Sequence, residues 1–334
     1  MNKLNRLRLT MGREMGLVIS LILMIAIFTA IDPIYLSPGN LLDIVDQSTI
    51  NGLLAIGITF VIITGGIDLS IGAIMAIVIV SVGTLLTRNG INPPTAIFLG
   101  IVIGALIGAL NGLLVTKIKL QPFIATLATM SAFRGVAYII TNGWPVLDIP
   151  PDFRRIMDGD LVGNFPVSIP ILLGFAVVGH VLLKKTRFGT FVISMGGNEE
   201  ATRLSGVNVN YNKVMTYAFC GVGAALAGMV MLARLGTGEP TAGQGYELYA
   251  IAAAAIGGTS LAGGKGSILG TLLGALLLSA LKTGLVVVGV DAFWQYIATG
   301  AIIAVAAYFE IIQGKFSSIR HKLLAKKENS KLAG

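Results

Sequence analysis

Residues that build disulfides, metal sites and catalytic centres are nearly absent. Among 334 residues there is one cysteine, Cys220, and there are two histidines, His180 and His321. A single cysteine cannot form an intrachain disulfide, and this set is too small for a Cys/His metal cage. No serine–histidine–aspartate, metal or paired-carboxylate arrangement is available either. We therefore predict no catalytic residue, no metal site and no enzyme activity for this chain.

Charged residues are also scarce. They make up 12% of the chain, against about 25% in soluble proteins, while 54% of residues are hydrophobic and the mean hydropathy is +0.84. Glycine is abundant, with 43 residues, whereas proline has only 11. This composition excludes a soluble enzyme, a fibre and a disordered chain. It predicts an all-α polytopic membrane protein, in which glycine lets helices approach closely.

Charge-free runs predict about ten transmembrane helices within one domain that covers 1–334. About 20 residues are needed to cross a bilayer. The runs are 15–31, 47–67, 69–87, 95–116, 120–133, 161–183, 214–233, 248–264, 266–281 and 292–309. We expect the fifth run to continue to about 141 and the ninth to about 288. The first run ends at Ile31-Asp32-Pro33 without a cleavage site, so we expect it to remain as a span.

The distribution of lysine and arginine predicts the orientation. With ten spans, 18 of the 24 basic residues fall in the tails 1–14 and 314–334, in the segment 184–213 or in the short turns on the same side. Only four fall on the opposite side. The positive-inside rule makes the richer side cytoplasmic, so both termini are expected in the cytoplasm. The net charge of +8 therefore reflects membrane orientation, and we expect no nucleic-acid partner.

Two sets of glycines recur every four residues and predict close helix packing. Gly100, Gly104, Gly108 and Gly112 form one set, and Gly266, Gly270 and Gly274 form the other. Each set lies along one face of a helix, where a neighbouring backbone can approach. Packing within the chain is the favoured interpretation, and a dimer interface is the alternative.

Two segments 192 residues apart share a Gly-Gly break between apolar runs. Such breaks at matching positions mark the transport path in many transporters. The candidate residues for the path or the helix breaks are Gly65, Gly66, Asp68, Ser70, Gly257, Gly258, Thr259 and Ser260. The alternative is a pair of cytoplasmic turns, with Asp68 capping the following helix. The second segment is not a phosphate-binding loop, because Thr259 and Gly266 stand where that motif requires glycine and a hydroxyl residue.

The segment 184–213 contains a predicted short cytoplasmic helix. Asn198 can cap it, Glu199 and Glu200 suit its first turn, and Gly206 can end it. A helix of about seven residues is not stable alone, so it needs a docking partner or the membrane surface. An interfacial helix without a partner is the alternative.

Several blocks resemble one family along nearly the whole chain. The blocks are Thr64–Ser70, Gln121–Leu127 with Arg134-Gly135, Gly196–Val207, Pro240–Gly243 with Gly245–Leu248, and Gly257–Gly266. The chain resembles the permease subunits of bacterial sugar ABC importers of the ribose/galactose/xylose group, and it is most similar to ribose permeases.

This resemblance implies a function and a set of partners. Such permeases are multi-pass proteins of the bacterial inner membrane and work as homodimers. They bind a cytoplasmic ATPase, which carries the ATP and Mg, and a periplasmic sugar-binding protein. The matching coupling helix, which docks into the ATPase, is Asn198, Glu199, Glu200, Ala201, Thr202, Arg203, Leu204, Ser205 and Gly206. A stand-alone secondary transporter or channel for a small polar solute is the alternative function.

The outer loops carry mixed charges that suit a docking protein. The candidates are Asp148, Asp152, Arg154 and Arg155 in the loop 142–160, joined by Glu239 and Glu247. A solvated loop without a partner is the alternative. Arg134 and Lys282 interrupt predicted spans, and we expect structural pairing or snorkelling there in preference to sugar contact.

Overall fold

The computed structural model describes residues 3–161, 163–291, 293–295, 297–298, 300–301 and 304, and for residues 3–13 it describes the backbone only. The chain divides into two compact units, 1–289 and 290–334. All labelled helices lie in the first unit. Most of the predicted span 292–309 and all of the tail 314–334 lie outside the described residues.

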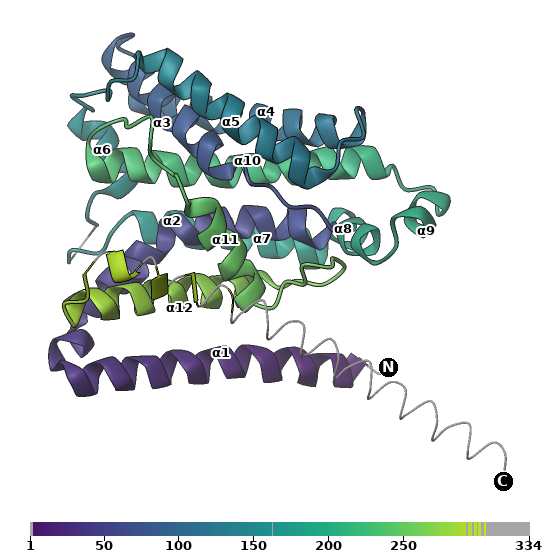
Figure 1. The fold of residues 1–334 in the computed structure, drawn as a ribbon, viewed down its shortest axis with the longest axis horizontal. Helices are drawn as coiled ribbons and strands as arrows, with labels where there is room; N and C mark the ends of the chain where they lie inside the picture. Colours follow the sequence, from purple (N-terminus) through teal and green to yellow (C-terminus); the bar gives the residue numbers. More distant parts are fainter. Residues whose placement is uncertain are drawn as a thin grey trace. The chain divides into compact units, whose positions relative to one another are not determined.

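The described part of the chain is helical and contains no extended strand, which confirms the all-α prediction (Figure 1). The elements are α1 (Lys3–Ile31), η1 (Pro33–Leu36), α2 (Pro38–Ile63), α3 (Ile71–Thr87), α4 (Pro93–Thr116), α5 (Pro122–Thr141), α6 (Pro151–Asp158), α7 (Ser168–Lys185), α8 (Arg187–Gly197), α9 (Glu199–Leu204), α10 (Val209–Leu235), α11 (Tyr246–Ile256) and α12 (Ile268–Val287).

Seven of these helices are long and apolar enough to cross a membrane, counted over the described residues. They are α1, α2, α4, α5, α7, α10 and α12. The helix α3 has 17 residues and α11 only 11. The expected continuous span 248–264 is therefore wrong, because α11 ends at Ile256, directly before the Gly257-Gly258 break.

Capping residues set several helix starts more accurately than the charge-free runs did. The Ser37 hydroxyl accepts a hydrogen bond from the Asn40 amide at 3.3 Å, and α2 begins with Pro38 at its first position. This start lies nine residues before the predicted 47, because Asp43 and Asp46 interrupt the apolar run. Serine caps and N-terminal prolines favour such starts even where charges follow.

The helix α2 forms the centre of the first unit. Its second half is almost entirely buried and packs against α10, α12, α11 and α7. In Figure 1, α1 runs alongside α12 at the edge of the bundle. The Tyr35 hydroxyl of η1 donates to the Ala280 carbonyl of α12 at 2.6 Å, which holds the turn between α1 and α2 against that helix.

Both periodic glycine sets pack within the chain, as the favoured interpretation predicted. A Cβ built on Gly104 would lie 2.4 Å from the Gly221 carbonyl of α10, and one built on Gly108 would lie 2.2 Å from the Tyr217 carbonyl. In α12, a Cβ on Gly270 would lie 2.0 Å from the Gly257 carbonyl. Only glycine permits such backbone approaches.

The loops gather at two ends of the bundle. The helix α10 has 27 residues, about 40 Å at 1.5 Å per residue, with α9 next to its start and α6 packed near its end. We call these the α9 end and the α6 end (Figure 1). The α4–α5 turn and the start of α12 lie at the α9 end, whereas the α3–α4 turn and the loop 236–245 lie at the α6 end. The predicted basic-rich turns among the described residues thus share one end.

Candidate functional site

The predicted short helix is present as α9 at one end of the bundle. It covers Glu199–Leu204 after an extended Asn198, whose side chain accepts a hydrogen bond from the Ala201 amide at 2.9 Å. Gly206 follows the helix with φ +84°, and its amide donates to the Arg203 carbonyl at 3.0 Å. The cap, the acidic first turn and the glycine stop are all confirmed.

Ion pairs tie the start of α9 to α10. The Glu199 carboxylate contacts Arg203 at 2.9 Å and Lys213 of α10 at 2.6 Å. Partial burial opposes ionisation of Glu199, but the hydrogen bond and charge of Lys213, followed by those of Arg203, outweigh it and lower the pKa of this carboxyl. Glu199 is therefore ionised at neutral pH and anchors the short helix.

The outward face of α9 is exposed in the described part of the chain. Thr202 is buried, whereas Glu200, Ala201 and Arg203 are exposed. Leu204 is 83% exposed, a high value for a large apolar side chain at a helix end. This face can accept a protein partner.

The two predicted helix breaks are real and meet in space. The helix α2 ends at Ile63, with Gly65 at φ +79°, and α11 ends at Ile256, with Gly258 at φ +93°. The Gly264 amide of the second break donates to the Ile63 carbonyl at 2.8 Å. The sequence predicted each break separately but not their contact.

A buried polar chain holds the first break. The amide and hydroxyl of Ser70 both donate to Asp68 Oδ1, at 2.8 and 2.6 Å, and Asn111 Nδ2 donates to the Ser70 hydroxyl at 2.6 Å. Asp68, Ser70 and Asn111 are fully buried within the chain. Asp68 accepts these bonds from Ser70, the residue before α3, and not from the first-turn amides, so it does not cap the helix as the alternative predicted.

Asn111 and Thr126 also belong to this site, although neither was among the predicted site residues. The Thr126 hydroxyl accepts from the Leu69 amide at 3.1 Å and lies 3.2 Å from the Ile67 carbonyl, so α5 also supports the break. A lone amide within the apolar run 95–116 was the available signal, because polar side chains inside membrane helices usually have a bonding role.

Backbone hydrogen bonds stabilise the second break. The Ser260 amide donates to the Lys265 carbonyl at 3.0 Å, and the Thr259 amide donates to the Ala254 carbonyl at 2.9 Å. Thr259 is fully buried, like Asp68 and Ser70. These three path candidates therefore face the interior of the chain in this conformation.

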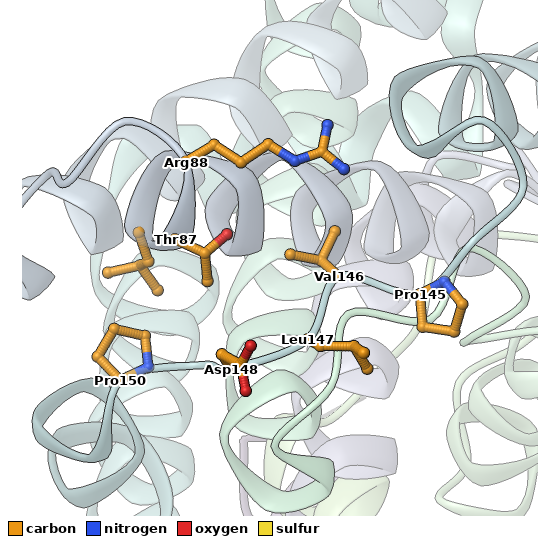
Figure 2. Close-up of a pocket in the computed structure, with 8 residues that line it drawn as sticks. Thr87, Arg88, Pro145, Val146, Leu147, Asp148 and Pro150 are labelled. Atoms are coloured by element: carbon orange, nitrogen blue, oxygen red, sulfur yellow. The ribbon is translucent and has the colours of Figure 1, made fainter.

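A cavity of about 490 Å³ opens at the α6 end, between the end of α3 and the proline-rich loop 145–150. Figure 2 shows Arg88 and Asp148 on opposite sides of it, with Thr87 and Val146 between them. The Val146 amide donates to the Gly238 carbonyl at 3.0 Å, and the Gly238 amide returns a bond of 2.7 Å. The loop is thus fixed while its charges remain exposed.

The predicted docking charges differ in their surroundings. Asp148, Asp152, Arg155 and Glu239 occupy the α6 end, and the first three are exposed. Arg154 Nε instead donates to the Ala233 carbonyl at 3.0 Å, and the Glu247 carboxylate accepts from the Gly245 amide at 3.2 Å. Arg154 and Glu247 therefore help to hold loops of their own chain.

An ion cluster at the α6 end was not predicted. Arg234 NH2 contacts Asp46 of α2 at 2.8 Å and Asp158 of α6 at 2.9 Å, and the Ser168 hydroxyl also donates to Asp46. Burial raises the pKa of Asp158, and the hydrogen bond from Arg234 only partly offsets this. The cluster joins α2 and α10 to the consecutive helices α6 and α7, and local patterns cannot show contacts over such sequence separations.

Arg134 has structural partners, as expected. Its NH1 atom donates to the carbonyls of Pro240 and Ala242, at 2.8 and 2.7 Å, and so ties α5 to the loop before α11. Lys282 is exposed on α12.

Over the residues that the structure describes, no group of three His, Cys, Asp or Glu side chains could hold a metal ion.

Comparisons with known proteins agree on one family. Residues 40–307 match the family described as "branched-chain amino acid transport system / permease component". The chain is 43% identical to the ribose import permease protein of Bacillus subtilis (strain 168) over 89% of its length and 92% of the relative. It is 41% identical to the ribose import permease protein of Escherichia coli (strain K12), over 88% and 92%.

A permease named for another sugar follows. The galactose/methyl galactoside import permease protein of Escherichia coli (strain K12) is 36% identical over 91% of this chain and 96% of its own length. No solved structure matches the chain.

Proposed function

The chain belongs to the branched-chain amino acid transport system / permease component family, and from this premise we propose that it imports ribose or a related monosaccharide as the membrane-spanning subunit of an ATP-driven importer. The observation that carries the proposal is the similarity to two ribose import permeases over about nine tenths of each chain. Permease subunits of this family are transport components and not enzymes.

We further propose three protein partners. A second copy of the permease completes the translocation path, a cytoplasmic ATPase supplies the energy and a periplasmic binding protein delivers the sugar. Because ATP and Mg belong to the ATPase, this chain needs no cofactor. The bacterial inner membrane is the corresponding location, with the α9 end in the cytoplasm.

The helix α9 is the proposed docking element for the ATPase. Its start is anchored by Asn198 and by the Lys213–Glu199 pair, while Glu200, Ala201 and Leu204 face outward. A six-residue helix with an anchored start and an exposed apolar end gains stability when a socket covers it. The segment Asn198–Gly206 would thus transmit motion from the ATPase.

The α6 end is the proposed docking surface for the binding protein. Asp148 and Arg88 line the cavity, and Asp152 and Arg155 are exposed on the neighbouring helix α6. Charges of both signs favour a partner with complementary charges. Glu239 would add a charge to this surface, and Arg154 and Glu247 would contribute by supporting the loops around it. The two Gly-Gly breaks remain the candidates for the moving part of the path.

Reconstitution in proteoliposomes tests the transport function. We expect ribose uptake only when the ATPase, ATP and the sugar-loaded binding protein are all present, with unlabelled xylose and galactose as competitors to rank the sugars. Uptake by the chain alone would instead support a stand-alone transporter.

A double substitution tests the docking helix. Glu200→Arg with Ala201→Glu changes only exposed positions, so the permease should still fold and insert. Co-purification of the ATPase and sugar-stimulated ATP hydrolysis should both fall, because charges on the socket lose their partners. Wild-type levels of both would exclude α9 as the coupling element.

A further inference from the structure

Three chain segments meet through their backbones next to α9. We call this contact the glycine junction, and it consists of Ile63 and Gly65 at the end of α2, Gly196 at the end of α8, and Gly263 and Gly264 in the second break. A Cβ built on Gly196 would lie 1.7 Å from the Ile63 carbonyl and 2.3 Å from the Gly264 amide nitrogen. No side chain fits between these segments.

The same contact includes the other glycines. Gly263 has φ +87°, and a Cβ built on it would lie 3.0 Å from the Gly196 carbonyl and 3.1 Å from the Gly65 nitrogen. The Gly264 amide also donates a hydrogen bond of 2.8 Å to the Ile63 carbonyl, which joins the second break to the end of α2. A backbone contact of this kind has no flexible side chain to absorb a displacement, so a push on one segment moves the others.

The helix α9 is joined rigidly to this junction. Only Gly197 and Asn198 separate Gly196 from the start of α9, and the Asn198 amide donates to the Ser194 carbonyl of α8 at 3.0 Å. On the other side, the Ile63 end leads directly into the Asp68–Ser70–Asn111 chain, and Gly264 leads to Ser267, the cap of α12. One contact thus connects α9 with both breaks.

We propose that the glycine junction is a rigid link that carries the displacement of α9 to both helix breaks, with Gly196 as its positioning residue. This inference rests on the proposed function, in which α9 docks the ATPase. It explains the glycine at position 196, in the last turn of α8, where a Cβ would have no room.

Two adjacent glycines offer a matched test. A Cβ on Gly196 collides with two backbones, whereas a Cβ on Gly197 has nothing within 4 Å. In proteoliposomes with the ATPase and binding protein, Gly196→Ala should bind the ATPase normally but lose at least about tenfold in sugar uptake. Gly197→Ala should stay within about twofold of wild type. Equal uptake by the two variants would overturn the proposal.

A reversible cross-link keeps the test decisive if Gly196→Ala does not fold. Gly264 packs against Gly197 and the next residue, Lys265, is exposed, so Gly197→Cys with Lys265→Cys places one thiol on each segment outside the contact itself. A short bifunctional methanethiosulfonate reagent joins the two thiols, and a reducing agent releases them. The released form of the same double variant is the control and should transport like wild type. A rigid link predicts the same uptake by the cross-linked form. Loss of uptake on cross-linking, restored by reduction, would show that the segments separate and would overturn the proposal.

The ATPase pull-down separates this inference from the proposed function. If α9 does not dock the ATPase, Glu200→Arg with Ala201→Glu leaves the pull-down unchanged. If only the junction proposal fails, the pull-down still depends on α9, but Gly196→Ala transports as well as Gly197→Ala.

Discussion

The two ends of the bundle are held together by different interactions. At the α9 end, glycines bring backbones into direct contact, as Gly196 does with Ile63 and Gly270 does with Gly257. At the α6 end, charged side chains bridge the helices, as Arg234 does between Asp46 and Asp158. Steric contact depends on the absence of a side chain, whereas the ion cluster depends on its presence. The two ends should therefore respond to opposite kinds of substitution.

This difference matters for the proposed transport cycle. A backbone contact between glycines transmits displacement over a short distance and involves no charged side chain. Such a contact suits the end where α9 would receive the force. The ion cluster holds the α6 end in one arrangement and leaves exposed loops for a docking partner. Five predictions test this comparison, and the first asks which end faces the cytoplasm.

Cysteine labelling should give an all-or-none difference between the ends. The native Cys220 is buried, so Leu204→Cys on α9 and Leu147→Cys at the α6 end can each provide an accessible thiol. In right-side-out vesicles, a membrane-impermeant maleimide should label only the cysteine at 147, and the cysteine at 204 should react after permeabilisation. The reverse pattern would invalidate the orientation inferred from the basic residues.

The substitution Gly270→Leu should remove most of the folded protein. A Cβ at this position already lies 2.0 Å from the Gly257 carbonyl, so the destabilisation should exceed the roughly 1–3 kcal/mol of ordinary overpacking. Gly174→Leu on α7 is the control, because a Cβ there has nothing within 4 Å. Size-exclusion profiles of the detergent-solubilised variants measure the effect. A monodisperse Gly270→Leu protein with wild-type transport would mean that this face does not pack as described.

The substitution Arg234→Met should destabilise the α6 end by about 2–3 kcal/mol, somewhat below the roughly 3–5 kcal/mol lost on breaking a fully buried pair. The three side chains are 14–25% exposed, and removal of Arg234 leaves the two carboxylates without their cation. Thermal unfolding in detergent measures the loss, with Arg155→Met at an exposed position as the control, expected within about 0.5 kcal/mol of wild type.

The loss caused by Arg234→Met should depend on pH. Burial already raises the pKa of Asp158, and removal of Arg234 raises it further. A carboxyl with a raised pKa in the folded state favours folding at low pH and loses that contribution as pH rises through its folded pKa. The deficit of Arg234→Met should therefore shrink on acidification, starting above the ordinary aspartate pKa of about 3.9. A deficit that does not change with pH would contradict the ionic origin.

The substitution Glu199→Gln should have the smallest effect. It weakens the contacts with Lys213 and Arg203, but the carboxylate is partly exposed, so global stability should hardly change. The amides of α9 should exchange hydrogen faster, which mass spectrometry of the peptide around 198–206 can measure. Because the pKa of Glu199 is lowered, its stabilisation is present at neutral pH and is lost as pH falls below about 4. Glu200→Gln, at an exposed neighbouring position, is the control and should leave exchange unchanged.

Local patterns in the sequence determined the class of protein, most of its helices and the form of α9. Composition excludes a soluble protein, and the runs of apolar residues locate the membrane helices, because both depend on how each segment meets lipid or water. The Asn198 cap and the Gly206 stop of α9 depend on residues within one or two helical turns. Such contacts can be read from neighbours in the chain.

Tertiary structure alone decided which of these segments touch. Gly65 was predicted as part of one break, and no contact was predicted for Gly196 or Gly263, but the backbones of all three meet at one junction. Ser70 links Asp68 to Asn111 by hydrogen bonds, and Arg234 pairs with Asp46, which lies 188 residues earlier in the chain. The physical reason is that these contacts depend on how whole helices pack in three dimensions, whereas periodicity and caps record only the preferences of a segment and its immediate neighbours.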